Sequence, residues 1–83
     1  AMFSPLDPDK LSEHGALAKE ALFSFGGEFL ARGGLLPLNG TIGYPKTAVI
    51  AFPSYEAALG WYWSPAYQAI IGLRNEAMDS QFL

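Results

Sequence analysis

Five side chains in this sequence combine the types that bind or convert small molecules: one imidazole, two guanidinium groups and two phenols. They are His14, Arg32, Arg74, Tyr62 and Tyr67. A guanidinium binds carboxylate or carbonyl oxygens through a rigid fork of N–H donors. An imidazole binds ligands or acts as a base near neutral pH. Together these types predict a pocket for an anionic or carbonyl-bearing compound.

Arg74 is the least expected of these residues, because it interrupts an apolar stripe at helical spacing. In one interpretation the stem of Arg74 packs while the guanidinium reaches solvent or pairs with a carboxylate, Glu28 and Glu56 being the nearest candidates. In the other, no carboxylate is in reach and the cation binds a ligand. The stripe consists of Tyr67, Ile70, Ile71, Arg74 and Met78.

His14 has a structural and a functional interpretation. It shares a helix face with Leu11 and Ala18, where a lone histidine is usually a satisfied core or rim residue, and the alternative is a ligand or base. Arg32 lies at a strand end beside two glycines and has the same two interpretations. Tyr62 and Tyr67 are expected to be core aromatics whose hydroxyls find a partner at the edge.

Several chemistries have no support in the sequence. There is no cysteine, and one histidine cannot build a zinc site alone, so no metal is expected. No Ser-His-Asp set can be identified, and the glycine pairs match no phosphate-binding loop. A haem hypothesis rests on His14 alone as axial ligand. We expect no cofactor, and the residues do not decide whether the protein is an enzyme.

Composition favours one small domain over residues 1–83, with ends that look trimmed, and a partner chain. Hydrophobic residues make up 51% of the sequence and charged ones 16%, against about 25% charged in an ordinary domain. A core of this size yields about 3–5 kcal/mol and often needs a further stabilising element. The scattered basic residues argue against nucleic acid, and no apolar run argues for a membrane span. A soluble, cytoplasmic protein is the default.

The helices are marked by their caps. Asp7-Pro8 predicts a helix start, with an apolar face that runs to Phe25 before Gly26-Gly27 ends it. Ser54 predicts a second start, with Tyr55, Ala58, Leu59 and Tyr62 inward and Trp61 and Trp63 off that stripe. Ser64-Pro65 predicts a third start, with the helix running to Met78.

The strands follow a different signal. Residues 28–32 predict a strand, Gly33-Gly34 a bulge or bend, and residues 35–38 a continuation into an Asn39-Gly40 hairpin turn. Residues 46–52 form the clearest strand, and both of its faces are apolar. Residues 80–83 predict a last strand, and residues 1–6 are compatible with the tail of a first one.

This order predicts an α+β, ferredoxin-like split βαβ fold, with an antiparallel sheet and the helices on one face. The chain has too few helices to cover the second apolar face of residues 46–52. We therefore expect a second copy to pack sheet against sheet, as a dimeric α/β barrel.

The motifs, in their order and spacing, resemble domain-of-unknown-function family 1330 over nearly the whole chain. They are Gly26-Gly27, Leu30-Ala31-Arg32-Gly33-Gly34, Asn39-Gly40, Pro45-Lys46, Phe52-Pro53-Ser54, Glu56-Ala57-Ala58, Trp61-Tyr62, Ser64-Pro65, Tyr67-Gln68-Ala69 and Leu73-Arg74. The resemblance implies a homodimeric α/β barrel and little about chemistry. The wider superfamily includes cofactor-independent oxygenases, isomerases, haem enzymes and ligand sensors, and fold alone does not choose among them.

Three hypotheses follow from these observations. The first is a small-molecule pocket between helices and sheet, lined by the five residues named at the outset. The second is a non-catalytic homodimeric interaction or scaffold module. The third, a minor one, is a haem-dependent or cofactor-independent oxygenase or isomerase.

Overall fold

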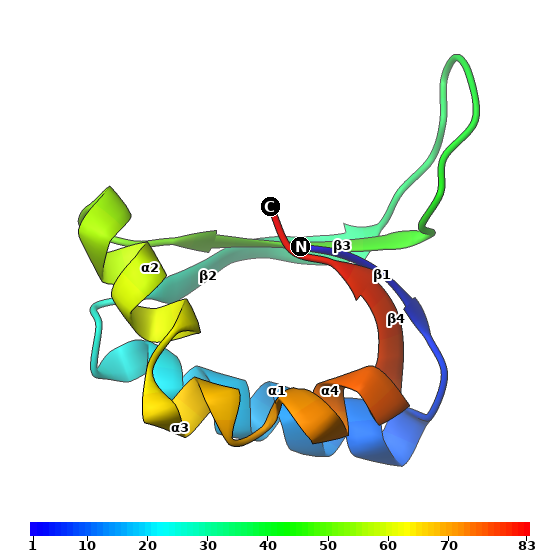
Figure 1. The fold of residues 1–83 in the computed structure, drawn as a ribbon. Helices are drawn as coiled ribbons and strands as arrows, with labels where there is room; N and C mark the ends of the chain where they lie inside the picture. Colours follow the sequence, from blue (N-terminus) through cyan, green and yellow to red (C-terminus); the bar gives the residue numbers. More distant parts are fainter.

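A four-stranded antiparallel sheet forms the structure, with three of the helices packed under one face and a short helix at one end of the sheet, in a computed structural model that describes residues 1–83 (Figure 1). The strand order is β2-β3-β1-β4. Along the chain the elements are β1 (Met2–Pro5), α1 (Pro8–Phe23), β2 (Glu28–Gly34), β3 (Lys46–Ala51), α2 (Tyr55–Tyr62), α3 (Pro65–Gln68), α4 (Ile71–Ala77) and β4 (Met78–Gln81). This confirms the α+β, ferredoxin-like fold expected from the element order.

The predicted caps begin three helices. The Asp7 carboxylate accepts hydrogen bonds from the backbone N–H groups of Asp9 and Lys10 at the start of α1. Ser54 accepts from Ala57 N–H at the start of α2, and Ser64 accepts from Tyr67 N–H at the start of α3. These bonds satisfy N–H groups that have no partner within the first helical turn.

The helix after Ser64 differs from the prediction because it is broken. α3 ends at Gln68, α4 begins at Ile71, and Met78 already belongs to β4. The last strand therefore starts two residues before the expected Ser80. The longest helix, α1, has 16 residues, and no helix of the chain combines the length and apolarity that crossing a bilayer requires.

The core lies between α1, the turn that joins α2 to α3, and the sheet. Its buried residues are Ala18, Ala21, Leu22, Trp61 and Tyr67. The predicted inward stripe of α2 is wrong, because Trp61 is buried while Tyr55 is 75% exposed. α2 is only 8 residues long and tilts away from α1 (Figure 1), so it buries the residues near its C-terminal end.

The two faces of the sheet are now assigned. Ile50 and Phe52 pack against the core, so the opposite face of β3 presents Thr47, Val49 and Ala51 away from the helices. Val49 is 47% exposed. The second face of this strand is therefore apolar and uncovered within one chain, as the sequence predicted.

The connection between β2 and β3 corrects the hairpin prediction. Residues 35–38 form no strand, and Asn39-Gly40 lies in a bend rather than in a two-residue turn between paired strands. The last ladder pair joins Gly34 to Lys46, so residues 35–45 form a long loop. Figure 1 shows this loop projecting from the sheet on the side opposite the helices. We call residues 35–45 the arm.

Candidate functional site

A cavity of about 520 Å³ lies between the sheet and α1. Its walls are mostly apolar, with Phe29, Ile50, Trp61 and Phe82 among them. A volume of about 300–1,000 Å³ with few polar groups is usual for small-molecule sites. The polar side chains of the lining are Ser12, His14, Lys19, Arg32 and Tyr67. Three of the five candidates from the sequence therefore line one cavity.

His14 and Tyr67 form the buried polar pair of this cavity. His14 Nε2 lies 3.3 Å from the Tyr67 hydroxyl oxygen, and the two side chains are 5% and 0% exposed. α1 carries His14 on its inward face, whereas the Ser64 cap fixes the start of α3 so that Tyr67 points into the core. Burial, together with the positive charge of Arg74, lowers the pKa of His14. The imidazole is therefore neutral at pH 7.

Tyr62 and Arg74 form a second polar pair next to the cavity. Arg74 Nη1 donates a hydrogen bond to the Tyr62 hydroxyl at 3.0 Å, and the guanidinium lies 4.8 Å from the centre of the Phe82 ring. The Tyr62 ring packs on Tyr67 with ring centroids 5.4 Å apart. Neither Tyr62 nor Arg74 lines the cavity itself, but each contacts a side chain that does.

Arg74 also acts on Tyr67. Burial raises the pKa of the Tyr67 hydroxyl, and the nearby guanidinium opposes part of that rise. For Arg74 itself, burial opposes the charge, but the interactions with the Tyr62 and Tyr67 hydroxyls, the Tyr62 hydrogen bond first among them, outweigh it and raise the pKa of the guanidinium. Arg74 therefore stays charged.

The predicted carboxylate partner of Arg74 is absent. The single ion pair of the molecule joins Lys10 to Glu76 at 3.1 Å, and neither Glu28 nor Glu56 bonds to Arg74. The partners of the guanidinium are a phenol, an aromatic face and the Asn75 side chain at 3.5 Å. The guanidinium is only partly buried, so water can supply the remaining hydrogen bonds.

Arg32 reaches the cavity because of a β-bulge. In the β2–β3 ladder Phe29 pairs with Ile50 and Arg32 pairs with Ala48, with a register shift at Leu30. Residues three apart on a regular strand face opposite sides. The extra residue reverses this alternation, so that Phe29 and Arg32 both face the helices. The bulge was predicted at Gly33-Gly34 and lies instead at Leu30.

Lys19 and Trp61 are cavity residues that the sequence did not single out as candidates. Lys19 adds a positive charge to the lining. Trp61, predicted to lie off the inward stripe of α2, is buried, and its indole N–H has no hydrogen-bond partner. The Ser64-Pro65 cap, which begins two residues after Tyr62, could have indicated that Trp61 is buried. It shows that α2 ends there, so the last residues of α2 lie where the chain turns back toward the core.

The side chains offer no ready metal centre, since no three of the histidine, aspartate and glutamate residues come together. Ligation of haem iron through His14 Nε2 would require the bond to Tyr67 to break. Met78 and Tyr67 also line the cavity and are residue types that can ligate haem iron, but nothing in the arrangement pairs either of them with His14 as an axial ligand set.

The ferredoxin-like sheet, with a cavity under one face, defines a class of small α+β proteins rather than an activity. The chain belongs to the family described as Domain of unknown function (DUF1330), whose model matches residues 1–83. This confirms the resemblance noted from the motifs. No curated protein is detectably similar to the chain.

Proposed function

We propose that this protein is a homodimeric α/β barrel that binds a small anionic or carbonyl compound in the cavity between sheet and helices. The observation that carries the proposal is the buried His14–Tyr67 pair in the wall of an otherwise apolar cavity of about 520 Å³. Arg32 lines the same cavity, and Tyr62 and Arg74 support its wall from behind Tyr67. No reaction is assigned to the site.

The arrangement of His14 favours a ligand over a purely structural role. Its Nε2 faces Tyr67, whereas Nδ1 has no protein partner and, unlike Trp61 Nε1, is not closed off from solvent. Because His14 lines the cavity, this nitrogen can bond to an oxygen of a ligand.

The dimer is supported by apolar surface on the side of the sheet that carries no helix. Only 10 of 83 residues are buried within one chain, which is a small core without a disulfide or a metal. The uncovered face presents Val49 and, at the bulge, Leu30, which is 61% exposed. A second copy of the same chain covers such a face through a twofold axis without leaving either copy's surface exposed.

The arm and α2 extend this apolar surface. Leu36 and Leu38 in the arm are 82% and 93% exposed, and the arm projects on the uncovered side (Figure 1). A second hollow of about 720 Å³ lies between β3 and α2 and is bordered by Val49, Leu59 and Trp63. Single apolar residues on a surface are ordinary, but several of them on the same uncovered side support an interface.

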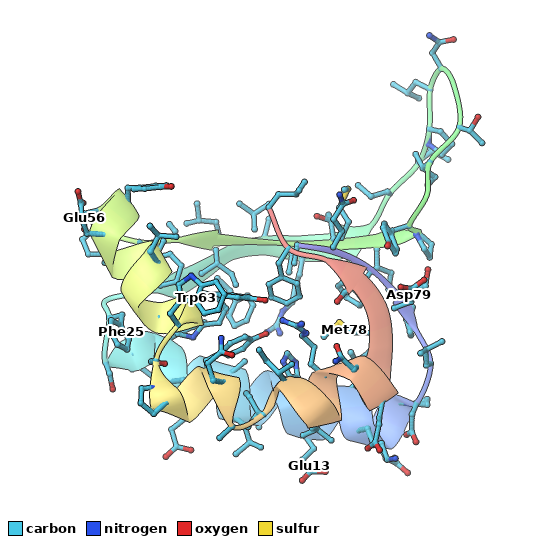
Figure 2. The ribbon with its side chains drawn as sticks, viewed as in Figure 1. Glu13, Phe25, Glu56, Trp63, Met78 and Asp79 are labelled. Atoms are coloured by element: carbon cyan, nitrogen blue, oxygen red, sulfur yellow. The ribbon has the colours of Figure 1, made fainter.

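The pocket is tested by a fragment screen with two-dimensional NMR on the ¹⁵N-labelled protein. The proposal predicts that anionic or carbonyl fragments shift the resonances of His14, Arg32 and Tyr67. Glu13, which points away from the cavity on the outer side of α1 (Figure 2), serves as the internal reference. If no fragment shifts the cavity residues while the dimer persists, the interaction or scaffold hypothesis replaces the pocket.

The dimer is tested by sedimentation. The unmodified chain is expected to sediment as a dimer at low micromolar concentration. Val49→Lys is expected to break the dimer and to destabilise the fold with it, because it places a charge on the uncovered face. Glu13→Lys introduces the same side chain outside that face and should leave the dimer intact. A folded monomer for the unmodified chain would contradict the barrel. The cytoplasmic location stays a prediction.

A further inference from the structure

The cavity carries enough polar detail to indicate the class of its ligand. Building on the proposed function, we infer that the site takes a compact apolar carboxylate with a second oxygen nearby. In this arrangement Arg32 binds the carboxylate at the cavity mouth, and His14 Nδ1 donates a hydrogen bond to the second oxygen.

The first argument is the sign of the charge around the cavity. The sequence has eight acidic and five Lys or Arg residues, so an unbiased lining would contain acids. The cavity is instead lined by Lys19 and Arg32 and by no aspartate or glutamate. Arg74 adds a third positive charge just behind the Tyr67 side of the wall. A net-acidic protein thus presents a positive cavity, which favours an anion.

The second argument is the way Arg32 is held. The bulge at Leu30 turns Arg32 to the helix-facing side of β2, and the guanidinium lies 4.9 Å from the centre of the Phe29 ring. Stacking on an aromatic face leaves the edge N–H donors of a guanidinium free. Arg32 makes no ion pair within the protein. Bulges commonly re-aim a side chain toward a functional site. The Arg32 guanidinium therefore offers two parallel N–H donors, without a protein partner, at the mouth of an apolar cavity. This geometry fits a carboxylate.

The third argument concerns what His14 offers. His14 Nε2 lies 3.3 Å from the Tyr67 hydroxyl, and in the inferred arrangement the hydroxyl donates the hydrogen of this bond. In the neutral imidazole the other nitrogen, Nδ1, then carries the proton and is a donor for the ligand. The one buried side-chain polar atom without a partner, Trp61 Nε1, is also a donor. Acceptor atoms on the ligand match these donors.

The apolar remainder of the cavity sets the body of the ligand. Phe29, Ile50, Trp61 and Phe82 surround the polar groups with aromatic and aliphatic carbon. Such walls favour a hydrocarbon or an aromatic ring over a sugar or a nucleotide, because unpaired hydroxyl groups lose their hydrogen bonds to water there. An aryl or alkyl group attached to the carboxylate and its neighbouring oxygen satisfies both parts of the site.

Three matched compounds test this class by NMR titration. Benzoylformate has the ring, the carbonyl and the carboxylate, phenylacetate lacks the carbonyl, and acetophenone has a methyl group in place of the carboxylate. We expect benzoylformate to bind most tightly, and each of the other two to bind about tenfold more weakly, because phenylacetate loses the hydrogen bond to His14 and acetophenone loses the one to Arg32. Higher salt should weaken the two acids and leave acetophenone unchanged.

Variants assign the two oxygens. Arg32→Gln should weaken both acids about tenfold without affecting acetophenone. Lys46→Gln removes a positive charge from the neighbouring strand outside the cavity lining and should change nothing. His14→Phe should make benzoylformate bind no better than phenylacetate. If that variant fails to fold, the ¹⁵N resonance of His14 Nδ1 in the unmodified protein decides the same point, because it should shift with benzoylformate and not with phenylacetate.

Two results would overturn the inference in different ways. Acetophenone binding in the cavity as tightly as benzoylformate would leave the pocket in place and refute the carboxylate class. No shift of the cavity resonances with any of the three compounds would also refute it. The pocket itself falls only if the wider fragment screen is silent as well.

Discussion

Arg74→Met measures how much the contacts of Arg74 contribute to stability. Those contacts set the expected change in the free energy of unfolding. The substitution removes the hydrogen bond from Nη1 to the Tyr62 hydroxyl and the stacking on Phe82. At a partly exposed site the first is worth about 0.5–1.5 kcal/mol, and the second about 0.5–1 kcal/mol. Methionine restores part of the apolar packing. We expect the free energy of unfolding to fall by about 1–2 kcal/mol.

Urea unfolding at one fixed protein concentration measures this loss, because a dimer's apparent stability depends on concentration. A shift of 1 kcal/mol corresponds to about 4–8 °C in the melting temperature of a domain of this size. Tyr62→Phe removes the same hydrogen bond from the other side. The double variant Arg74→Met/Tyr62→Phe should therefore lose less than the two single losses added together.

A buried ion pair would behave differently. Removing one partner of such a pair strands the other charge and costs about 3–5 kcal/mol. A loss in that range for Arg74→Met would mean that a carboxylate does contact Arg74 and that the phenol partner has been misassigned. If Arg74→Met, Tyr62→Phe and the double variant all unfold with the free energy of the unmodified protein, the Tyr62 contact contributes nothing in solution.

Three further predictions concern caps, pH and packing. Asp7→Ala and Ser64→Ala should each lower the free energy of unfolding by about 1 kcal/mol. If the urea midpoints of both variants are unchanged, these residues do not cap the helices. Burial lowers the pKa of His14 in the folded state, so the unfolded chain binds a proton at His14 at a higher pH than the folded chain does. The free energy of unfolding should therefore fall as the pH drops below about 6.5. His14→Gln should make the free energy of unfolding, measured by urea titration, less dependent on pH in this range. Gly27→Ala places a Cβ 2.7 Å from a Phe52 ring carbon and should cost about 1–3 kcal/mol by calorimetry.

Local signals predicted the elements well. The helix starts at Asp7-Pro8 and Ser64-Pro65 can be predicted from a few adjacent residues, because the capping side chain accepts a hydrogen bond from a backbone N–H two or three positions later. The apolar run of residues 48–52 predicted a strand over residues 46–52 with two apolar faces. Which face meets the helices depends on residues far along the chain, so the assignment of Ile50 inward and Val49 outward needed the structure.

The site itself depends on features that leave no local signal. The glycine pair at residues 33–34 suggested a bulge there, but the extra residue is Leu30, and that position decides that Arg32 enters the cavity. The partner of Arg74 is a phenol twelve residues earlier on a different helix, where a carboxylate was expected. Trp61 is buried because a short helix packs by its end, which counting a helical stripe does not capture.

Blocking the cavity tests the central claim, that the space under the sheet is a binding site, most directly. Gly15 lies in α1 and lines the cavity, and a Cβ at this position meets nothing within 4 Å. Gly15→Leu should therefore fill the cavity while stabilising the helix by about 1 kcal/mol. Gly72→Leu makes the same change in α4, also with open space around the Cβ but outside the cavity lining.

The decisive measurement is the dissociation constant of benzoylformate, or of the tightest fragment from the screen, for these two variants by NMR titration. The account predicts that Gly15→Leu abolishes binding and remains folded, whereas Gly72→Leu binds as the unmodified protein does. Undiminished binding to a folded Gly15→Leu protein would contradict it, because the ligand would then occupy another part of the molecule.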